Sequence, residues 1–131
     1  SMVAAAALAR LPVSIRSGLR LLTHGSPMGR LYGRFFPAYF GQEFRSELLQ
    51  RVGGQWINLF RRTDPIGGSV DLENVDRTCL DPETDHHELG DPLPPVKGHS
   101  FYSGTAAYET AIADLNQKDA RRRTPDASQS G

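Results

Sequence analysis

The sequence lacks several features that would assign it to a large class of proteins. It contains one cysteine, Cys79, which excludes an internal disulfide framework. Its 15 basic and 15 acidic residues balance, which argues against a dominant role in binding nucleic acid or anionic membranes, because both need a positive surplus. No run reaches the roughly 18–20 apolar residues of a membrane helix, and the apolar start lacks the basic region of a signal peptide. These absences do not assign a compartment.

Apolar runs and helix-favouring segments alternate along the first half of the chain. Residues 3–11 (VAAAALARL) are rich in alanine, and because polar residues are nearly absent they predict a helix buried on more than one side. Residues 19–23 and 55–60 are short apolar runs bounded by turn residues, which is typical of buried strands. Residues 42–51 (QEFRSELLQR) predict an amphipathic helix that ends before two glycines.

An aromatic segment lies between the two predicted strands. The spacing of its aromatic side chains over residues 28–40 fits a helix face, which Pro37 must break or kink. These side chains fit a buried core, a lid or acyl-chain pocket, or an exposed patch left by a missing part of the sheet. They are Tyr32, Phe35, Phe36, Tyr39 and Phe40.

The second half of the chain has fewer apolar residues. Residues 71–98 are predicted to form a long loop, and loops of this length are usually functional or mobile. Residues 105–115 (TAAYETAIADL) predict a helix with Thr105 as a cap. The charged and Ser-bearing residues 116–131 predict a disordered tail, so the ordered domain is expected to span residues 1–115.

The order of the predicted elements indicates an α/β fold. Strands that alternate with helices imply parallel strands with flanking helices. Two strands are too few for a stable sheet of this type. We therefore expect a partial fold in which the N-terminal half of the sheet is absent and belongs upstream of residue 1.

Two side chains stand where catalytic groups collect in such sheets. Asp64 follows the second predicted strand and His99 follows the long loop, and ligands gather beyond the carboxyl ends of parallel strands. An acid followed along the chain by a histidine matches the later two members of a Ser-Asp-His triad. Asp64 would orient the imidazole of His99, at a distance of about 2.6–3.2 Å or somewhat more. The competing interpretations are that Asp64 only caps an Asp-Pro turn and that His99 is a solvent-exposed loop residue.

Three segments carry a resemblance to α/β-hydrolases of the serine esterase or lipase kind. LLTHGSPMGRLY resembles their strand-plus-GSP segment, WINLFRRTDPIGGSV their acid-bearing segment, and GHSFY their histidine-bearing segment. The set is similar to an uncharacterised group of hydrolase-like domains in actinobacterial proteins, some of them membrane-associated. The resemblance spans roughly residues 1–115 and implies an ester substrate, either a small molecule or a lipid. It implies no cofactor or metal, with Asp64 and His99 as catalytic residues.

The departure from this family pattern concerns the nucleophile. No G-x-S-x-G sequence occurs, although the family carries its serine in that motif. In the resemblance, the serine lies just before the helix at residues 3–11, and therefore upstream of Ser1. Ser26 precedes Pro27 and lacks the glycine pattern, which favours a turn role. The chain alone is therefore predicted to be inactive.

Other polar residues are better explained without chemistry. His24 ends a strand and is interpreted as a structural hydrogen-bonding residue. The run at residues 85–88 (DHHE) lacks a second cluster at zinc spacing, and the acids at 71, 73 and 76 lack the calcium-loop spacing. Cys79 has no neighbouring base in the sequence and is interpreted as an inert thiol. The run at residues 121–123 (RRR) is interpreted as part of a solvated tail.

Two classes of function remain open from the sequence. The first is an enzyme segment that supplies the acid and the histidine of an ester hydrolase. The second is a binding or scaffolding module that keeps the fold without the chemistry, in which the aromatic segment contacts a partner or a membrane-bound neighbour. Neither class predicts a nucleic-acid partner, and any membrane association would come from other parts of the parent protein.

Overall fold

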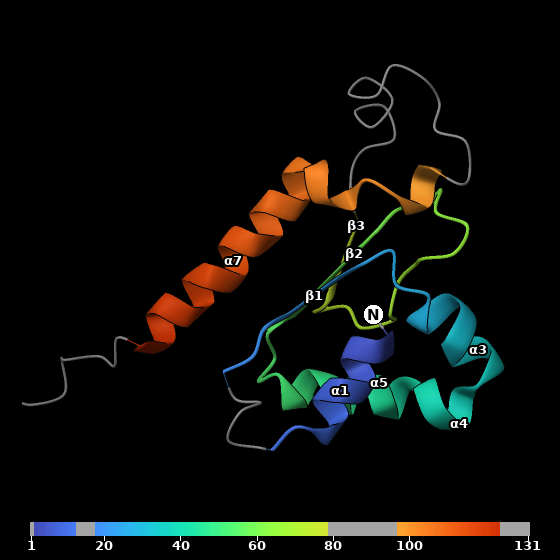
Figure 1. The fold of residues 1–131 in the computed structure, drawn as a ribbon, viewed down its shortest axis with the longest axis horizontal. Coiled ribbons are helices and arrows are strands. Elements are labelled where there is room, and N and C mark those ends of the chain that lie inside the picture. The colour runs from blue at the N-terminus through green and yellow to red at the C-terminus, as the bar shows by residue number, and fades with distance from the viewer. Residues whose placement is uncertain (1, 13–17, 79–96, 124–131) are drawn as a thin grey trace, which may run out of the picture.

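A computed structural model gives the fold of residues 2–12, 18–78 and 97–123 (Figure 1). The sheet has three parallel strands in the order β1-β2-β3: Leu21–His24, Trp56–Phe60 and Asp76–Thr78. The parallel α/β arrangement predicted from the sequence is therefore present as a small sheet with flanking helices. The third strand, however, lies inside the predicted long loop of residues 71–98, so that loop prediction is wrong for β3.

Helices cover both faces of the sheet (Figure 1). Alternate residues of a strand point to opposite faces, so β2 contributes Trp56 to one core and Ile57 to the other. The first core joins Trp56 to helices α1 (Met2–Arg10) and α5 (Gln42–Arg51). The second core joins Ile57 to helix α7 (Ala106–Arg123), which runs along the opposite face.

The first helix is less buried than its composition suggests. Ala5 and Leu8 are buried in the first core, whereas Val3 is 84% exposed and the neighbouring alanines are exposed as well. The prediction that this helix is buried on more than one side is therefore wrong. Alanine favours the helix wherever it lies, because its side chain loses no entropy in that conformation.

The aromatic segment forms three short helical pieces rather than one helix. They are the π-helical turn η1 (Met28–Tyr32), α3 (Gly33–Phe35) and α4 (Pro37–Phe40), and the break falls at Phe36, immediately before Pro37, as predicted. Most of its aromatic side chains are exposed, which favours the patch interpretation over the core one. The exposed members are Tyr32, Phe35, Phe36 and Tyr39.

The last helix is longer than the sequence pattern indicated. It continues to Arg123, so residues 116–123 are helical although we predicted a disordered tail for them. Residues 124–131 lie outside the described part of the chain. Within the described residues, no helix has the length and apolar character needed to cross a membrane.

A buried polar network fixes the middle of the sheet and the loop beyond it. Asn58, in β2, accepts a hydrogen bond from Thr23 and donates to the Asp76 carboxylate and to the Gly68 carbonyl oxygen. The Asp76 carboxylate also accepts from the Ser69 hydroxyl and from the main-chain N–H groups of residues 70 and 72. These bonds tie β3 and the loop at residues 68–72 to the central strand, which helps to explain why a polar segment forms a strand here.

Candidate active site

Asp64 and His99 lie together at the carboxyl-terminal edge of the sheet. Asp64 lies four residues beyond the end of β2, and His99 ends the short helix η2 (Lys97–His99). The Nδ1 atom of His99 is 3.0 Å from Oδ2 and 3.1 Å from Oδ1 of Asp64. Both distances fall within the range predicted from the sequence. Two residues 35 positions apart along the chain are thus in hydrogen-bonding contact.

The Asp64 carboxylate is fully buried and surrounded by hydrogen-bond donors. Oδ1 accepts from the main-chain N–H groups of Ile66 at 2.8 Å and Gly67 at 2.7 Å. Oδ2 accepts from the hydroxyl of Tyr102 at 2.8 Å. With His99, these donors occupy the lone-pair sites that an ionised carboxylate presents. In a protonated carboxyl group, the O–H would face one of these N–H or O–H donors.

The electrostatics of Asp64 agree with an ionised group. Burial alone would raise the pKa of Asp64, but the hydrogen bonds from Gly67, Tyr102, Ile66 and His99 outweigh it and hold that pKa below its ordinary value. An ionised carboxylate can only accept hydrogen bonds, so His99 must donate from Nδ1. In the neutral imidazole, Nε2 is then the unprotonated nitrogen, which is the tautomer that a general base needs.

His99 remains open to solvent while its acid partner is buried. The His99 side chain is 37% exposed, and that of Asp64 is 0% exposed. Among the described residues, Asp64 is the sole hydrogen-bond partner of His99. The Nε2 atom is therefore not occupied by a described residue, so this nitrogen can exchange a proton with a bound molecule.

Arg61 holds the backbone on both sides of the histidine. Its Nη1 atom donates to the carbonyl oxygens of Gly98 at 3.2 Å and Ser100 at 2.7 Å, the residues immediately before and after His99. Its guanidinium carbon lies 4.6 Å from the centre of the Tyr102 ring, a cation–π contact. Arg61 follows β2 directly, so the strand that leads to the acid also anchors the histidine.

Two glycines allow the loops to approach the acid. Gly25 follows β1 with a φ of +53°, and a Cβ atom there would lie 3.0–3.2 Å from atoms of Tyr102, Asp64 and His99. A Cβ atom on Gly67 would lie 2.5 Å from Oδ2 of Asp64 and 2.4 Å from the backbone of Gly25. Both loops therefore pack backbone against backbone beside the carboxylate, and any side chain would separate them.

Two other residues considered from the sequence lie near the site, and His24 contributes a ring contact where a hydrogen-bonding role was predicted. The His24 ring stacks on Tyr102 with centres 5.2 Å apart. Burial lowers the pKa of His24, and the nearby charge of His99 lowers it further. Ser26 is fully buried, and its Oγ accepts from the main-chain N–H of Met28, as in a turn.

No group of described residues has the composition and spacing to hold a metal ion. Asp76, one of the acids considered for calcium, is occupied by the protein donors named above. Residues 85–88 and Cys79 lie outside the described part of the chain, and residues 121–123 lie in the last turns of α7.

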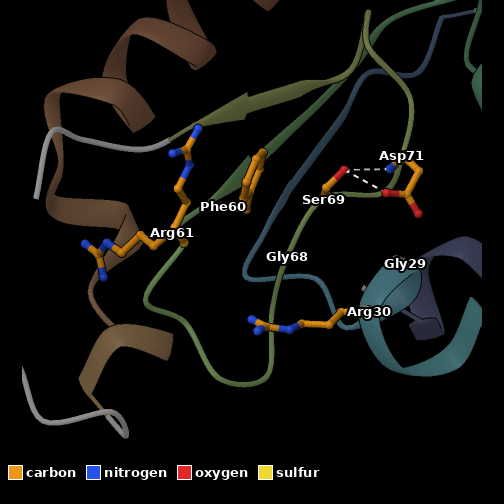
Figure 2. A pocket seen from close by; sticks show the side chains of 8 residues that line it. Gly29, Arg30, Phe60, Arg61, Gly68, Ser69 and Asp71 are labelled. Carbon is orange, nitrogen blue, oxygen red and sulfur yellow. Dashed lines mark hydrogen bonds between the residues drawn. The ribbon is translucent and has the colours of Figure 1, made fainter. Parts of the chain in front are cut away.

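A cavity of about 320 Å³ lies at the same edge of the sheet (Figure 2). Arg30 and Arg61 line it, and both also hold the site, because Arg30 donates to the main-chain oxygen of Asp64. On the other wall, the Ser69 hydroxyl oxygen accepts a hydrogen bond from the main-chain N–H of Asp71 at 2.8 Å (Figure 2). Arg45 pairs with Asp71 at 3.0 Å and offsets its charge, so the cavity wall is basic overall. Its remaining lining residues are Gly29, Phe60, Arg62 and Gly68.

Comparison with known proteins adds no family assignment. No protein-family model matches the chain, and neither the curated proteins nor the solved structures contain a match to it. The function of the chain is therefore inferred from the geometry of its site.

Sequence reasoning missed most of the residues that surround Asp64 and His99. Arg61 and Arg30 look like ordinary surface charges in the sequence, because their bonds are to main-chain oxygens of distant segments. Tyr102 carried a weak signal, since it lies in the GHSFY segment three residues after His99. The Gly-Gly pair at residues 67–68 indicated a turn, and the tight contact with Gly25 became visible only in three dimensions.

Proposed function

We propose that this chain is the C-terminal segment of a serine hydrolase that cleaves carboxylic esters of small molecules or lipids. In this proposal Asp64 orients His99 and stabilises its charged form. His99 Nε2 takes the proton of a serine hydroxyl and later delivers it to the leaving alcohol. The serine belongs to a segment that precedes α1. This chemistry requires no metal or cofactor.

The observation that carries the proposal is the contact of a buried, ionised Asp64 with Nδ1 of a half-exposed His99. A histidine that only stabilised the fold would have no need of a side chain that is 37% exposed and whose Nε2 bonds to no described residue. A carboxylate that only capped its turn would have no need of an imidazole partner. The arrangement matches the orienting acid and general base of a triad.

The sheet offers a place for the missing serine. The main-chain N–H groups of Leu21 and Gly25 donate to carbonyl oxygens of residues 55 and 59, on the β2 side. Because alternate residues of a strand bond to opposite neighbours, the N–H and C=O groups of Leu22 and His24 point to the other edge of β1. Among the described strands, none pairs with that edge. A further parallel strand paired there would end close to Gly25, where an added Cβ atom would lie 3.2 Å from His99 Nδ1.

The position of α1 favours the same edge. Helices α1 and α5 lie on one face of the sheet, and α5 belongs to the connection from β1 to β2 (Figure 1). Parallel connections are right-handed in about 98% of cases, so two of them on the same face step across the sheet in the same direction. A strand leading into α1 would therefore lie beside β1, on the side away from β2.

The test begins with the codons that precede residue 1. The proposal expects them to encode a strand and a serine in a G-x-S-x-G-like turn that leads into α1. If that coding sequence contains no such serine, the enzyme proposal is wrong and the binding-module interpretation takes its place. The chain alone should not turn over a chromogenic ester above background, and clear turnover by it would show that its nucleophile is not missing.

The extended protein then allows a direct test. Asp64→Asn should lower kcat about 10⁴-fold, and His99→Gln should lower it by at least as much. Asp114→Asn is the matched control, because Asp114 is partly exposed on α7 and pairs with Arg77 away from the site. Equal activity of the Asp64 variant and this control would rule out the proposed role of Asp64.

A further inference from the structure

A tyrosine near the proposed catalytic pair occupies an unusual position for a core residue. Tyr102 lies in the short helix η3 (Tyr102–Gly104), three residues after His99, and is 1% exposed. Its hydroxyl contacts two groups from the end of β2, the Asp64 carboxylate at 2.8 Å and the main-chain N–H of Arg61 at 3.2 Å. Both partners belong to the segment that carries the acid.

The direction of these hydrogen bonds is fixed by the partners. A main-chain N–H can only donate, so the tyrosine oxygen accepts from Arg61. An ionised carboxylate can only accept, so the single hydroxyl proton points to Oδ2 of Asp64. Burial raises the pKa of Tyr102, and the charge of Asp64 raises it further, which keeps this proton in place.

The two oxygens of Asp64 are held by different parts of the protein. Oδ1 accepts two main-chain N–H groups of its own turn, Ile66 and Gly67. Oδ2 accepts from the Tyr102 hydroxyl, and Nδ1 of His99 lies at nearly equal distances from Oδ2 and Oδ1, 3.0 and 3.1 Å. The tyrosine hydroxyl therefore supplies the second fixed point that defines the plane of the carboxylate. Without it, the remaining described donor to Oδ2 would be the His99 Nδ1–H, which Oδ2 shares with Oδ1.

We propose that Tyr102 is a positioning residue that orients the Asp64 carboxylate toward Nδ1 of His99. This inference depends on the proposed function for its catalytic meaning. The ring of Tyr102 is itself restrained by the Arg61 guanidinium and by the ring of His24. One short segment thus carries both the imidazole and the hydroxyl that aligns its acid.

The contrasting interpretation is that Tyr102 only fills the core. Its ring belongs to the second core with Ile57 and Ala111, and phenylalanine would fill that space equally well. Tyr102→Phe removes only the hydroxyl and therefore separates the two interpretations. Tyr108→Phe is the matched control, because Tyr108 packs against the same core but its hydroxyl bonds to no described residue.

The first measurement uses this chain and needs no activity. Long-range ¹H–¹⁵N spectra report which nitrogen of a neutral histidine is protonated, and His99 should be protonated at Nδ1. Tyr102→Phe should lose part of that signal to the other tautomer, and Tyr108→Phe should retain all of it. Asp64→Asn should change the tautomer completely. If Asp64→Asn leaves it unchanged, the proposed function itself fails, whereas a loss confined to Asp64→Asn overturns only the role of Tyr102.

Two further measurements keep the inference testable. In the extended enzyme, Tyr102→Phe should lower kcat about tenfold with little change in KM, as is usual for residues that orient a reacting group. An unchanged kcat would overturn the role. If Tyr102→Phe does not fold, the unmodified chain should still show a slowly exchanging Tyr102 hydroxyl proton, and its absence would refute the hydrogen bond.

Discussion

The tight packing of Gly67 provides the most direct test of the geometry at this site. An added Cβ atom would lie 2.4–2.5 Å from the backbone of Gly25 and from Oδ2 of Asp64. Ordinary contact begins at 3.4 Å, so the two loops must separate by about 1 Å in Gly67→Ala. Gly25 is met at its backbone and the Asp64 carboxylate is held by several hydrogen bonds, which means that the backbone must move.

The expected cost of Gly67→Ala has two parts. Overpacking of a tight interior typically costs about 1–3 kcal/mol. The movement also breaks the hydrogen bond from the Gly67 N–H to Asp64, and a bond to a charged group contributes about 1.5–3 kcal/mol. We expect a combined loss of about 3–5 kcal/mol, which is a large part of the 5–15 kcal/mol that stabilises a typical domain.

The chain contains a convenient probe for this measurement. Trp56 is its single tryptophan and is 1% exposed, so urea unfolding can be followed by fluorescence. Gly104→Ala is the control, because a Cβ atom there meets nothing within 4 Å. It should change the free energy of unfolding by less than about 1 kcal/mol. A similarly small effect of Gly67→Ala would refute the close approach of the two loops.

Three other predictions concern charge and pH. The pKa of Asp64 is lower in the folded chain than in the unfolded chain, where it is near 4, so ionised Asp64 stabilises the fold above about pH 4. This stabilisation is lost as the pH falls through the folded pKa. Urea midpoints measured from pH 2 to 7 should show the loss, and Asp64→Asn should remove that part of the pH dependence. The pKa of His24 is also lowered in the folded chain, so protonation of His24 favours the unfolded chain. The free energy of unfolding should therefore fall as the pH drops below about 6.5. A His24→Gln variant whose urea midpoint falls as much as that of the unmodified chain would contradict this. Asp76→Ala leaves several hydrogen-bond donors without an acceptor and should lower the free energy of unfolding by about 3 kcal/mol. Glu73→Ala is the control, because Glu73 is exposed, and it should change that free energy by less than about 0.5 kcal/mol. Equal effects of the two variants would show that the network is unimportant.

The sequence predicted the elements whose signal is local. The helix at residues 42–51 has the predicted bounds, since its apolar spacing and the following glycines are both strong signals. Strand β3 was missed because Asp76–Thr78 has no apolar alternation and pairs with β2 only in the folded chain. The end of α7 was placed too early because polar composition was taken as disorder, although lysine, glutamine and arginine favour helices.

The candidate site shows the same division between local and distant signals. Asp64 and His99 could be selected from the sequence because each follows a recognisable segment at the edge where parallel strands end. The residues that hold them could not, because Arg61 acts through main-chain oxygens 37 and 39 positions further along the chain and Gly25 acts through its lack of a side chain. Such contacts depend on the three-dimensional path of the backbone.

The structure also removes a conflict between two interpretations of Asp64. From the sequence, a carboxylate that caps its own Asp-Pro turn and a carboxylate that orients a histidine are alternatives. In the fold, Oδ1 accepts the N–H groups of Ile66 and Gly67, Oδ2 accepts from Tyr102, and His99 Nδ1 lies within hydrogen-bonding distance of both oxygens. The turn therefore fixes Oδ1, and with Tyr102 on Oδ2 the carboxylate is presented to His99 at a fixed angle. Capping is the local means by which the acid is oriented, which is why an Asp-Pro turn is a suitable place for such an acid.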